Sequence, residues 1–300
     1  MTADLASPGT GALVRGIVRS VRPKQWAKNV LVFVAPGAAG VLLKPTSLLQ
    51  ACLAFLVFSM AAGSCYLLND VLDVEADRRH PRKSKRPIAA GIVPIPLALV
   101  LSIVFGLGAV GLAIWRTPKF GLIIGLYLVL TTLYSSYLKH QPVLDIVGLS
   151  SGFVLRLLGG GYATDVAITD WFLIISAFGA MFIATCKREA EKKEMGDSTD
   201  TRAALATYSE GYLEYMKAVT SGLVLIAYCL FAVQRANEHP PAAVWVMLSI
   251  LPFVIAILRY ALLVDQGLGS APEDVLIGDR QMQIFGVIYA VLMGVSVYAS

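Results

Sequence analysis

Residues 48–69 read LLQACLAFLVFSMAAGSCYLLN, an apolar run without a charged side chain. About 20 apolar residues in a helix are enough to cross the hydrocarbon core of a bilayer, so this run predicts a transmembrane helix. The chain offers nine candidate spans of this kind, at residues 29–43, 48–69, 93–115, 120–138, 142–162, 170–187, 214–233, 241–264 and 281–299. We therefore expect an all-α, polytopic membrane protein with about nine transmembrane helices.

The composition excludes several other classes of protein. Hydrophobic residues make up 57% of the 300 residues and charged residues only 15%, far from the usage of soluble domains. A β-barrel would show segments of about ten residues with strict alternation, whereas these apolar runs are continuous. The four cysteines lie in or beside apolar stretches without a C-x-x-C pattern, so we expect no disulfide framework. Residues 1–28 lack the apolar core of a removable signal peptide.

The Lys and Arg residues are shared unevenly between the two sides of the predicted spans. Twenty of the 25 fall on the side of the N-terminus and four on the other, with Arg156 inside a span. Because cytoplasmic segments carry the excess of Lys and Arg, we expect a multi-pass protein of the cell membrane with a cytoplasmic N-terminus. Residues 1–28 would form a cytoplasmic segment and 29–300 a single helical domain, with charged cytoplasmic loops at 70–92 and 187–213.

The apolar run at 48–69 leads into an acidic motif, NDVLDVEAD at residues 69–77. At 100° per residue, four oxygen-bearing side chains share one helical face: Asn69, Asp70, Asp73 and Asp77. Carboxylates one turn apart repel each other unless a cation neutralises them. We expect Mg²⁺ at this face, because this ion uses one or two carboxylates and completes its shell with water and phosphate oxygens. The alternative is a solvated acidic helix end, which the position at the end of a membrane span disfavours.

A basic run follows at residues 78–87, RRHPRKSKRP, with six cations within nine residues. Such a cluster holds a loop in the cytoplasm and contacts anionic lipid headgroups, and that explanation accounts for part of it. Its place beside the acidic face indicates a second role, because a metal ion and Arg or Lys together form the usual clamp on a diphosphate leaving group.

The fourth and fifth spans contribute Tyr134, Lys139, Asp145 and Arg156. An arginine inside a span costs roughly 2.5–3.5 kcal/mol on insertion scales, so it normally faces a protein interior or a water-filled cavity. Arg156 is therefore the best intramembrane functional candidate. The alternative, a structural partner of Asp145, carries nearly equal weight, although eleven residues of helix would put about 16 Å between the two.

The sixth span leads into KREAEKKE at residues 187–194, where Lys187, Glu191 and Glu194 share a helical face. Such a run is often only a solvated, ion-paired helix. It could equally be a second half-site opposite Asp73.

Together these residues resemble the UbiA superfamily of intramembrane prenyltransferases. The matches are residues 69–77, the stretch RPIAAG at 86–91, Tyr134-Ser135 with Lys139, and Arg156 followed by glycines. They run in family order across most of the chain; the first motif is specific and the others are supporting. The resemblance implies a UbiA-like helical bundle with an active site that faces the cytoplasm.

One departure from the family pattern is informative. The family usually carries a second Asp-rich motif at the end of the sixth helix, where this chain has Lys187 and Glu191. This segment and the run RPKQWAKN at 22–29 resemble the decaprenyl-phosphate phosphoribosyltransferase branch. That branch transfers a 5-phosphoribosyl group from phosphoribosyl diphosphate to a polyprenyl phosphate, for arabinan cell-wall synthesis. Donor and acceptor bring additional phosphates, which need more cations than ordinary prenyl transfer does.

The resemblance implies a role for each motif residue. Asp73, Asp77 and Lys187 are expected to be catalytic, with Mg²⁺ held by Asn69, Asp73 and Asp77. The phosphoribosyl diphosphate donor is expected to bind Lys24, Asn69, Asp70, Lys83, Arg86, Tyr134, Lys139, Arg188 and Glu191. The lipid phosphate is expected to bind Arg156 and Lys139. The expected partners are this donor, a polyprenyl phosphate lipid and the membrane; no nucleic acid is expected, and a homo-oligomer is left open.

Three alternatives remain at this point. A prenyl diphosphate transferase that acts on an aromatic acceptor shares the first motif, but it predicts a second Asp cluster that the sequence lacks. A transporter would use Arg156 and the carboxylates to bind an ion or substrate, and it predicts paired, interrupted helices from internal repeats, which are not evident. A lipid-scaffold protein leaves the ordered acidic and basic motifs unexplained.

Overall fold

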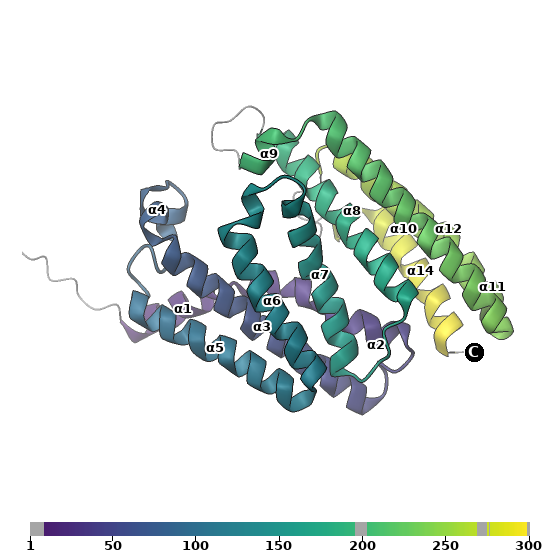
Figure 1. Ribbon diagram of the computed structural model, residues 1–300, viewed down its shortest axis with the longest axis horizontal. Coiled ribbons are helices and arrows are strands. Elements are labelled where there is room, and N and C mark those ends of the chain that lie inside the picture. Colours follow the sequence, from purple (N-terminus) through teal and green to yellow (C-terminus); the bar gives the residue numbers. More distant parts are fainter. Residues whose placement is uncertain (1–8, 196–202, 269–274, 276, 299–300) are drawn as a thin grey trace, which may run out of the picture. The chain divides into compact units, whose positions relative to one another are not determined.

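The computed structural model describes residues 9–195, 203–268, 275 and 277–298. Every regular element within these ranges is a helix, as Figure 1 shows, and the expected all-α fold is confirmed. Parts of three expected segments lie outside the described residues: 1–8 of the N-terminal segment, 196–202 of the second charged loop, and 299 of the last span.

The helices follow one another along the chain with short connections, and η marks the 3₁₀ helices among them. They are α1 (Thr10–Ser20), η1 (Pro23–Phe33), α2 (Val34–Ala38), α3 (Pro45–Leu72), α4 (Val74–Arg79), η2 (Lys83–Lys85), α5 (Ile95–Arg116), α6 (Pro118–Ser136), η3 (Leu138–His140), α7 (Leu144–Ala163), α8 (Asp170–Met195), α9 (Ala203–Thr207), α10 (Glu210–Glu238), η4 (Pro240–Ala242), α11 (Ala243–Leu248), α12 (Ile250–Asp265) and α14 (Arg280–Tyr298). Helix α8 continues into the expected loop at 187–213, so its charged residues project from a regular helix.

Eight helical segments among the described residues are long and apolar enough to cross a membrane. They are α3, α5, α6, α7, α8, α10, the η4–α12 segment (Pro240–Asp265) and α14. The structure differs from expectation at 29–43, where the 3₁₀ helix η1 leads into the short helix α2. Val32 and Ala35 are buried in this segment, and irregular backbone at membrane depth is tolerated where protein covers it.

The chain divides into two compact units. The first consists of Met1–Val30 and Cys52–Ser135, and the second of Leu31–Ala51 and Ser136–Ser300.

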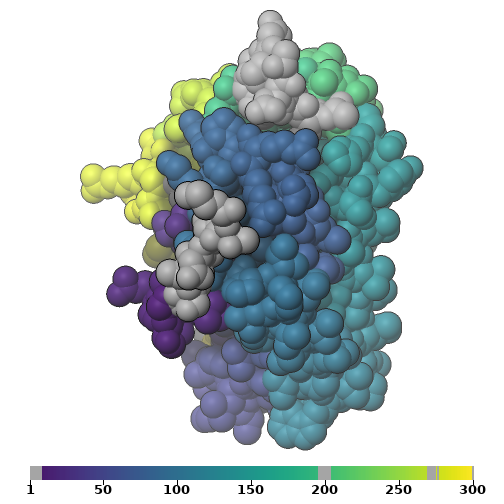
Figure 2. All heavy atoms as spheres, turned by 90° about the vertical axis from the view of Figure 1, so that its left-hand side faces the viewer, coloured from purple at the N-terminus to yellow at the C-terminus, as the bar shows by residue number. Residues whose placement is uncertain are grey.

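In the first unit, an apolar cluster surrounds the end of α3 and includes the buried residues Leu67, Val74 and Ile88. Leu13 and Ile17 of α1 pack against this cluster, and Figure 2 shows α1 in purple beside the blue surface around α4. Helices α3 and α5 are joined by hydrogen bonds between serines 64 and 102, in which each hydroxyl donates to the carbonyl of the other residue, at 2.8 and 2.9 Å. The acidic motif therefore starts from a firmly packed helix end.

In the second unit, glycine lets η1 approach α7. A Cβ added to Gly160 would lie 1.9 Å from the carbonyl oxygen of Val32, and one added to Gly161 would lie 2.4 Å from a side-chain carbon of Ile168. Both distances are shorter than any real Cβ contact, so only glycine fits at this close approach of two backbones.

A buried ion pair joins α7 to α8 in the same unit. Asp145 in the first turn of α7 is 1% exposed and accepts a hydrogen bond of 2.6 Å from Nε of Arg188, which is also 1% exposed. The hydroxyl of Tyr208 donates to the other carboxylate oxygen and accepts the backbone N–H of Val143 at 2.6 Å. Burial raises the pKa of Tyr208, and the hydrogen bond to Asp145 raises it further, so the hydroxyl keeps its proton and remains a donor.

Replacing Gly160 with Ala should strongly destabilise the protein, because the new methyl group has no room beside the backbone of Val32. The matched control is Gly222→Ala in α10, where an added Cβ meets nothing within 4 Å; it should be neutral or stabilise by up to about 1 kcal/mol. Thermal unfolding of both variants in detergent measures the difference. Equal melting temperatures would contradict the close packing of η1 on α7.

Replacing Arg188 with Met should cost about 3–5 kcal/mol of stability, because the Asp145 charge would stay buried without its cation. The double variant Asp145→Leu with Arg188→Met removes both charges and should recover much of that loss. Thermal unfolding of the single and double variants tests this. A double variant less stable than the single one would show that the ion pair does not set the stability of this contact.

Candidate active site

The acidic face predicted from the sequence is present at the end of α3. The helical path continues through Asp73, since its N–H donates to the Asn69 carbonyl at 2.9 Å and its carbonyl accepts the N–H of Asp77 at 2.8 Å. The amide nitrogen of Asn69 donates to the Asp73 carboxylate at 3.0 Å. Asp70 and Asp77 are buried, at 2% and 3% exposure, whereas Asn69 and Asp73 are half-buried. The face therefore has an inner and an accessible pair of polar side chains.

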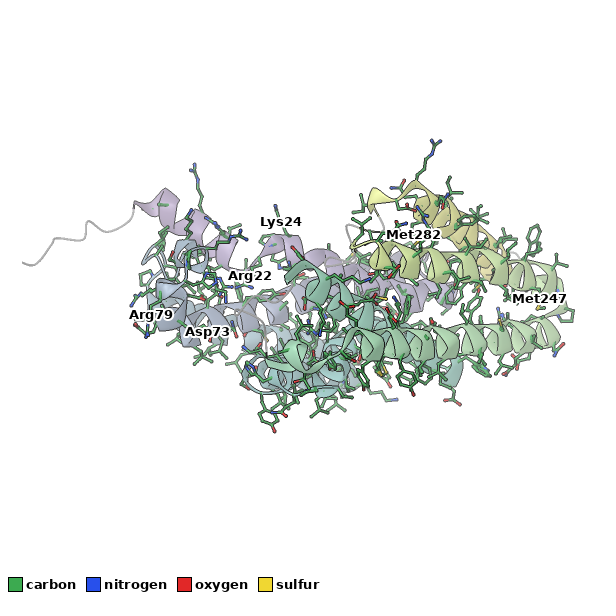
Figure 3. The ribbon with its side chains drawn as sticks, turned by 90° about the horizontal axis from the view of Figure 1, so that it is seen from above. Arg22, Lys24, Asp73, Arg79, Met247 and Met282 are labelled. Atoms are coloured by element: carbon green, nitrogen blue, oxygen red, sulfur yellow. The ribbon has the colours of Figure 1, made fainter. Side chains whose placement is uncertain are left out.

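Two arginines neutralise the inner pair. Arg22 donates to Asp70 at 2.5 Å, and its guanidinium lies 4.8 Å from the ring centre of Tyr66. Arg86 donates to Asp70 at 3.2 Å and to Asp77 at 2.6 Å. Figure 3 shows Arg22 and Asp73 at the same end of the first unit. Sequence reasoning assigned Arg86 to the site but missed Arg22, although Arg22 opens the run at 22–29.

Other expected donor-binding residues of the first unit are available to a ligand. Lys24 and Lys83 are exposed, and their ammonium groups form no ion pair within the described part of the chain. Tyr134 is half-buried near the end of α6. The long, flexible side chains of the two lysines can therefore supply positive charge near the acidic motif.

The residues present fit a magnesium ion that completes its shell with phosphate. Within the described residues, no three His, Cys, Asp or Glu side chains are grouped to form a closed metal site. Mg²⁺ does not require one, because it usually takes one or two carboxylates, several waters and substrate phosphate oxygens. The carboxylate of Asp73 lies beside the amide of Asn69, so these two residues offer adjacent oxygen ligands. Asp77 shares one oxygen with Arg86.

The second unit carries its own charged cluster at the end of α8. Lys187 lies 3.9 Å from Glu191, as their predicted common face requires, and its side chain is 22% exposed. Arg188 is bound by Asp145 and also donates to Glu191. The guanidinium of Arg188 thus serves the interior of the unit, and Lys187 is the more accessible cation. Sequence reasoning missed Tyr208, for which no local pattern gives a signal.

Arg156 and Lys139 lie in the second unit as well. Arg156 is 7% exposed and donates to the carbonyl of Gly152 at 2.7 Å, one turn earlier on α7. Asp145 is paired with Arg188 and Tyr208, so the expectation that helical distance disfavours an Arg156–Asp145 pair is confirmed. Lys139 is half-buried in η3, next to the start of α7.

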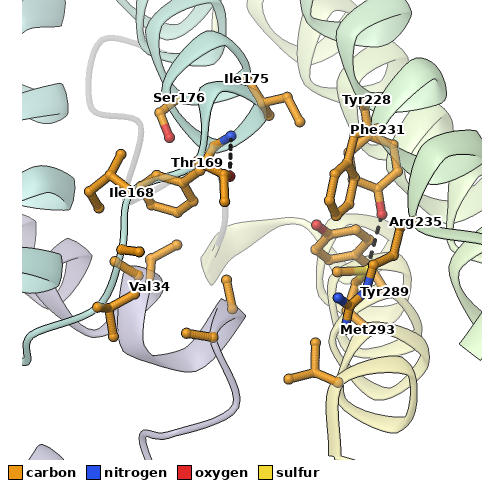
Figure 4. Close-up of a pocket in the computed structure, with 17 residues that line it drawn as sticks. Val34, Ile168, Thr169, Ile175, Ser176, Tyr228, Phe231, Arg235, Tyr289 and Met293 are labelled. Atoms are coloured by element: carbon orange, nitrogen blue, oxygen red, sulfur yellow. Dashed lines mark hydrogen bonds between the residues drawn. The ribbon is translucent and has the colours of Figure 1, made fainter. Parts of the chain in front are cut away.

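The second unit also contains a cavity of about 380 Å³. Figure 4 shows Val34 and Ile168 on one side of it and an aromatic wall from α10 and α14 on the other. That wall is formed by Tyr228, Phe231 and Tyr289. Among the described residues that line the cavity, Arg235 carries the only charge, so the cavity is suited to an apolar chain.

Comparisons with known proteins agree with this architecture. Residues 30–270 match the UbiA prenyltransferase family. The chain is 40% identical, over 303 aligned positions, to the decaprenyl-phosphate phosphoribosyltransferase of Mycobacterium tuberculosis, covering 99% of both proteins. It is 38% identical to the Corynebacterium glutamicum protein of the same name, covering 95% of this chain and 88% of that one.

Solved structures show the same fold at low sequence identity. A UbiA homologue from Archaeoglobus fulgidus, bound to GPP and Mg²⁺, superposes with a TM-score of 0.69 and 18% identity over 95% of this chain and 100% of its own. A digeranylgeranylglyceryl phosphate synthase has a TM-score of 0.67 and 15% identity, covering 96% of this chain and 99% of its own. With the family match over most of the chain and relatives at 38–40% identity, this chain belongs to the UbiA prenyltransferase family.

Proposed function

We propose that this membrane protein transfers a 5-phosphoribosyl group from phosphoribosyl diphosphate to decaprenyl phosphate, or a similar polyprenyl phosphate, in a magnesium-dependent reaction. The product would serve arabinan cell-wall precursor synthesis. The observation that carries the proposal is identity of 38–40%, over nearly the whole chain, to proteins named decaprenyl-phosphate phosphoribosyltransferase. The replacement of a second Asp-rich motif by Lys187 and Glu191 supports it.

In this reaction the first unit handles the diphosphate. Asn69, Asp73 and Asp77 would hold Mg²⁺, which when bound neutralises charge on the departing diphosphate. Arg86, Lys83 and Lys24 add positive charge there. Because negative charge builds on the leaving oxygen, these groups stabilise the transition state more than the ground state. The site would face the cytoplasm, as the distribution of Lys and Arg predicts.

The remaining motif residues bind the other phosphates. Lys187 would contact the donor, held by Glu191 and the buried Arg188, while Tyr134 and Lys139 help to orient the ribose and its phosphate. Arg156 and Lys139 would bind the lipid phosphate, whose oxygen attacks C1 of the ribose. The bond from C1 to the lipid phosphate oxygen forms as the bond to diphosphate breaks, with inversion expected at C1. A phosphate is already ionised near neutral pH, so the step needs no strong general base.

The apolar cavity of the second unit is suited to part of the polyprenyl tail. On α7, Arg156 lies about 7–8 Å of helical rise from Gly161, at the rise of 1.5 Å per residue. Ile168, which lines the cavity, packs against Gly161. A lipid phosphate at Arg156 would therefore place the first isoprene units close to the cavity wall.

The experiment that tests the proposal uses purified protein, phosphoribosyl diphosphate labelled in the ribose carbons, and polyprenyl phosphate. Label should enter the lipid phase only with Mg²⁺. A parallel reaction with a prenyl diphosphate and an aromatic acceptor should give no product. Product in the parallel reaction alone would assign the protein to ordinary prenyl transfer instead.

Replacing Asp73 with Asn should lower kcat at least about a hundredfold, the scale of losing one preorganised electrostatic contact. The matched control is Glu75→Gln in the same motif, because this side chain is 71% exposed and pairs only with Arg78. The control should keep wild-type turnover, and both variants should insert into the membrane. Normal turnover in Asp73→Asn would contradict the metal-binding role of this residue.

Replacing Ala39 with Trp should narrow the cavity, since Ala39 is one of its lining residues. The variant should lose activity on long polyprenyl phosphates and retain it on acceptors of one or two isoprene units. Ala218→Trp on the exposed face of α10 is the matched control and should leave chain-length preference unchanged. Equal losses on short and long acceptors would show that the tail does not use this cavity.

A further inference from the structure

Arg22 has a backbone conformation that side chains rarely adopt. Its φ is +53°, in the left-handed region, where non-glycine residues are uncommon. The following residue is Pro23, which further restricts the residue before it. Strained positions of this kind persist only where surrounding contacts enforce them, and they are frequent at functional sites.

The contacts of Arg22 show what holds it there. Its N–H donates to the Arg19 carbonyl at 3.3 Å, and its own carbonyl accepts the N–H of Gln25 at 2.9 Å. The side chain, with the ring of Tyr66 beside it, points to Asp70. The turn between α1 and η1 therefore directs this guanidinium at a carboxylate that is only 2% exposed.

The charges around Asp70 are balanced two against two. Asp70 and Asp77 are buried carboxylates, and Arg22 and Arg86 are the cations bound to them. Arg86 contacts both carboxylates, whereas Arg22 contacts Asp70 alone. Without Arg22, one shared guanidinium would have to neutralise two buried charges, and it could be drawn toward a ligand only at a large electrostatic cost.

We propose that Arg22 is a positioning residue: by neutralising Asp70, it leaves Arg86 able to bind the diphosphate of the substrate. This inference rests on the proposed function insofar as a diphosphate is the ligand. Arg22 acts through Asp70 and Arg86 and does not itself contact the reacting atoms. Its strained backbone is the cost of bringing a cation from the N-terminal segment to the end of α3.

The first test separates the side chain from the backbone. Arg22→Gly removes the guanidinium but tolerates the positive φ, whereas Arg22→Ala removes it and keeps the strain. Both variants should raise the dissociation constant for inorganic diphosphate with Mg²⁺ by about tenfold or more, the scale of one weakened charge-assisted hydrogen bond. Wild-type binding in Arg22→Gly together with weak binding in Arg22→Ala would reduce Arg22 to a backbone role and overturn the proposal.

The second test removes the charge that Arg22 neutralises. Arg22→Gln should weaken diphosphate binding, and adding Asp70→Asn should restore much of it, because Arg86 then has one carboxylate fewer to serve. In the transfer assay the same pair should raise and then lower the KM for the donor, with the KM for polyprenyl phosphate unchanged. A double variant as weak as the single one would overturn the proposal.

Binding and transfer are measured separately, so the two proposals fail in different ways. If the wild-type protein binds diphosphate with Mg²⁺ but transfers no phosphoribosyl group, the proposed function fails while the role of Arg22 is decided by binding. If it transfers the group and the Arg22 variants bind and turn over normally, the role of Arg22 fails. If the wild-type protein does not bind diphosphate, the role of Arg22 is overturned as well.

Discussion

A buried carboxylate must be neutralised where it is buried, and both units of this protein meet that requirement with arginine. In the first unit Asp70 and Asp77 share Arg22 and Arg86, and in the second unit Asp145 is bound by Arg188. The partners come from distant parts of the sequence, so each pair also fixes helix ends against one another. The charged clusters therefore shape the protein as well as its chemistry.

The same requirement separates charges that are used internally from charges that remain for a ligand. Asp70 and Arg188 are almost fully buried and occupied, whereas Asp73, Lys83 and Lys187 are accessible. An accessible carboxylate beside an amide, surrounded by cations, is suited to a metal-bound diphosphate. Phosphoribosyl transfer needs this arrangement and little acid–base chemistry, which fits a set of residues without a histidine in a central role.

Much of this arrangement follows from local sequence patterns. Apolar length predicted eight of the helical spans, and helical periodicity alone placed Asn69, Asp70, Asp73 and Asp77 on one face. The segment at 29–43 differed, because its irregular backbone is supported by contact with Gly160, which no local pattern reveals. Arg22 and Tyr208 were missed for the same reason: their roles depend on contacts 48 and 63 residues away.

The most direct measurement follows two phosphorus atoms of the donor. Phosphoribosyl diphosphate would be radiolabelled either in the 5-phosphate or in the terminal phosphate of the diphosphate, and incubated with the protein, Mg²⁺ and polyprenyl phosphate. Transfer of the phosphoribosyl group predicts that the 5-phosphate label enters the lipid and the terminal label is released as diphosphate. Terminal label in the lipid, or no lipid label from either donor, would contradict it.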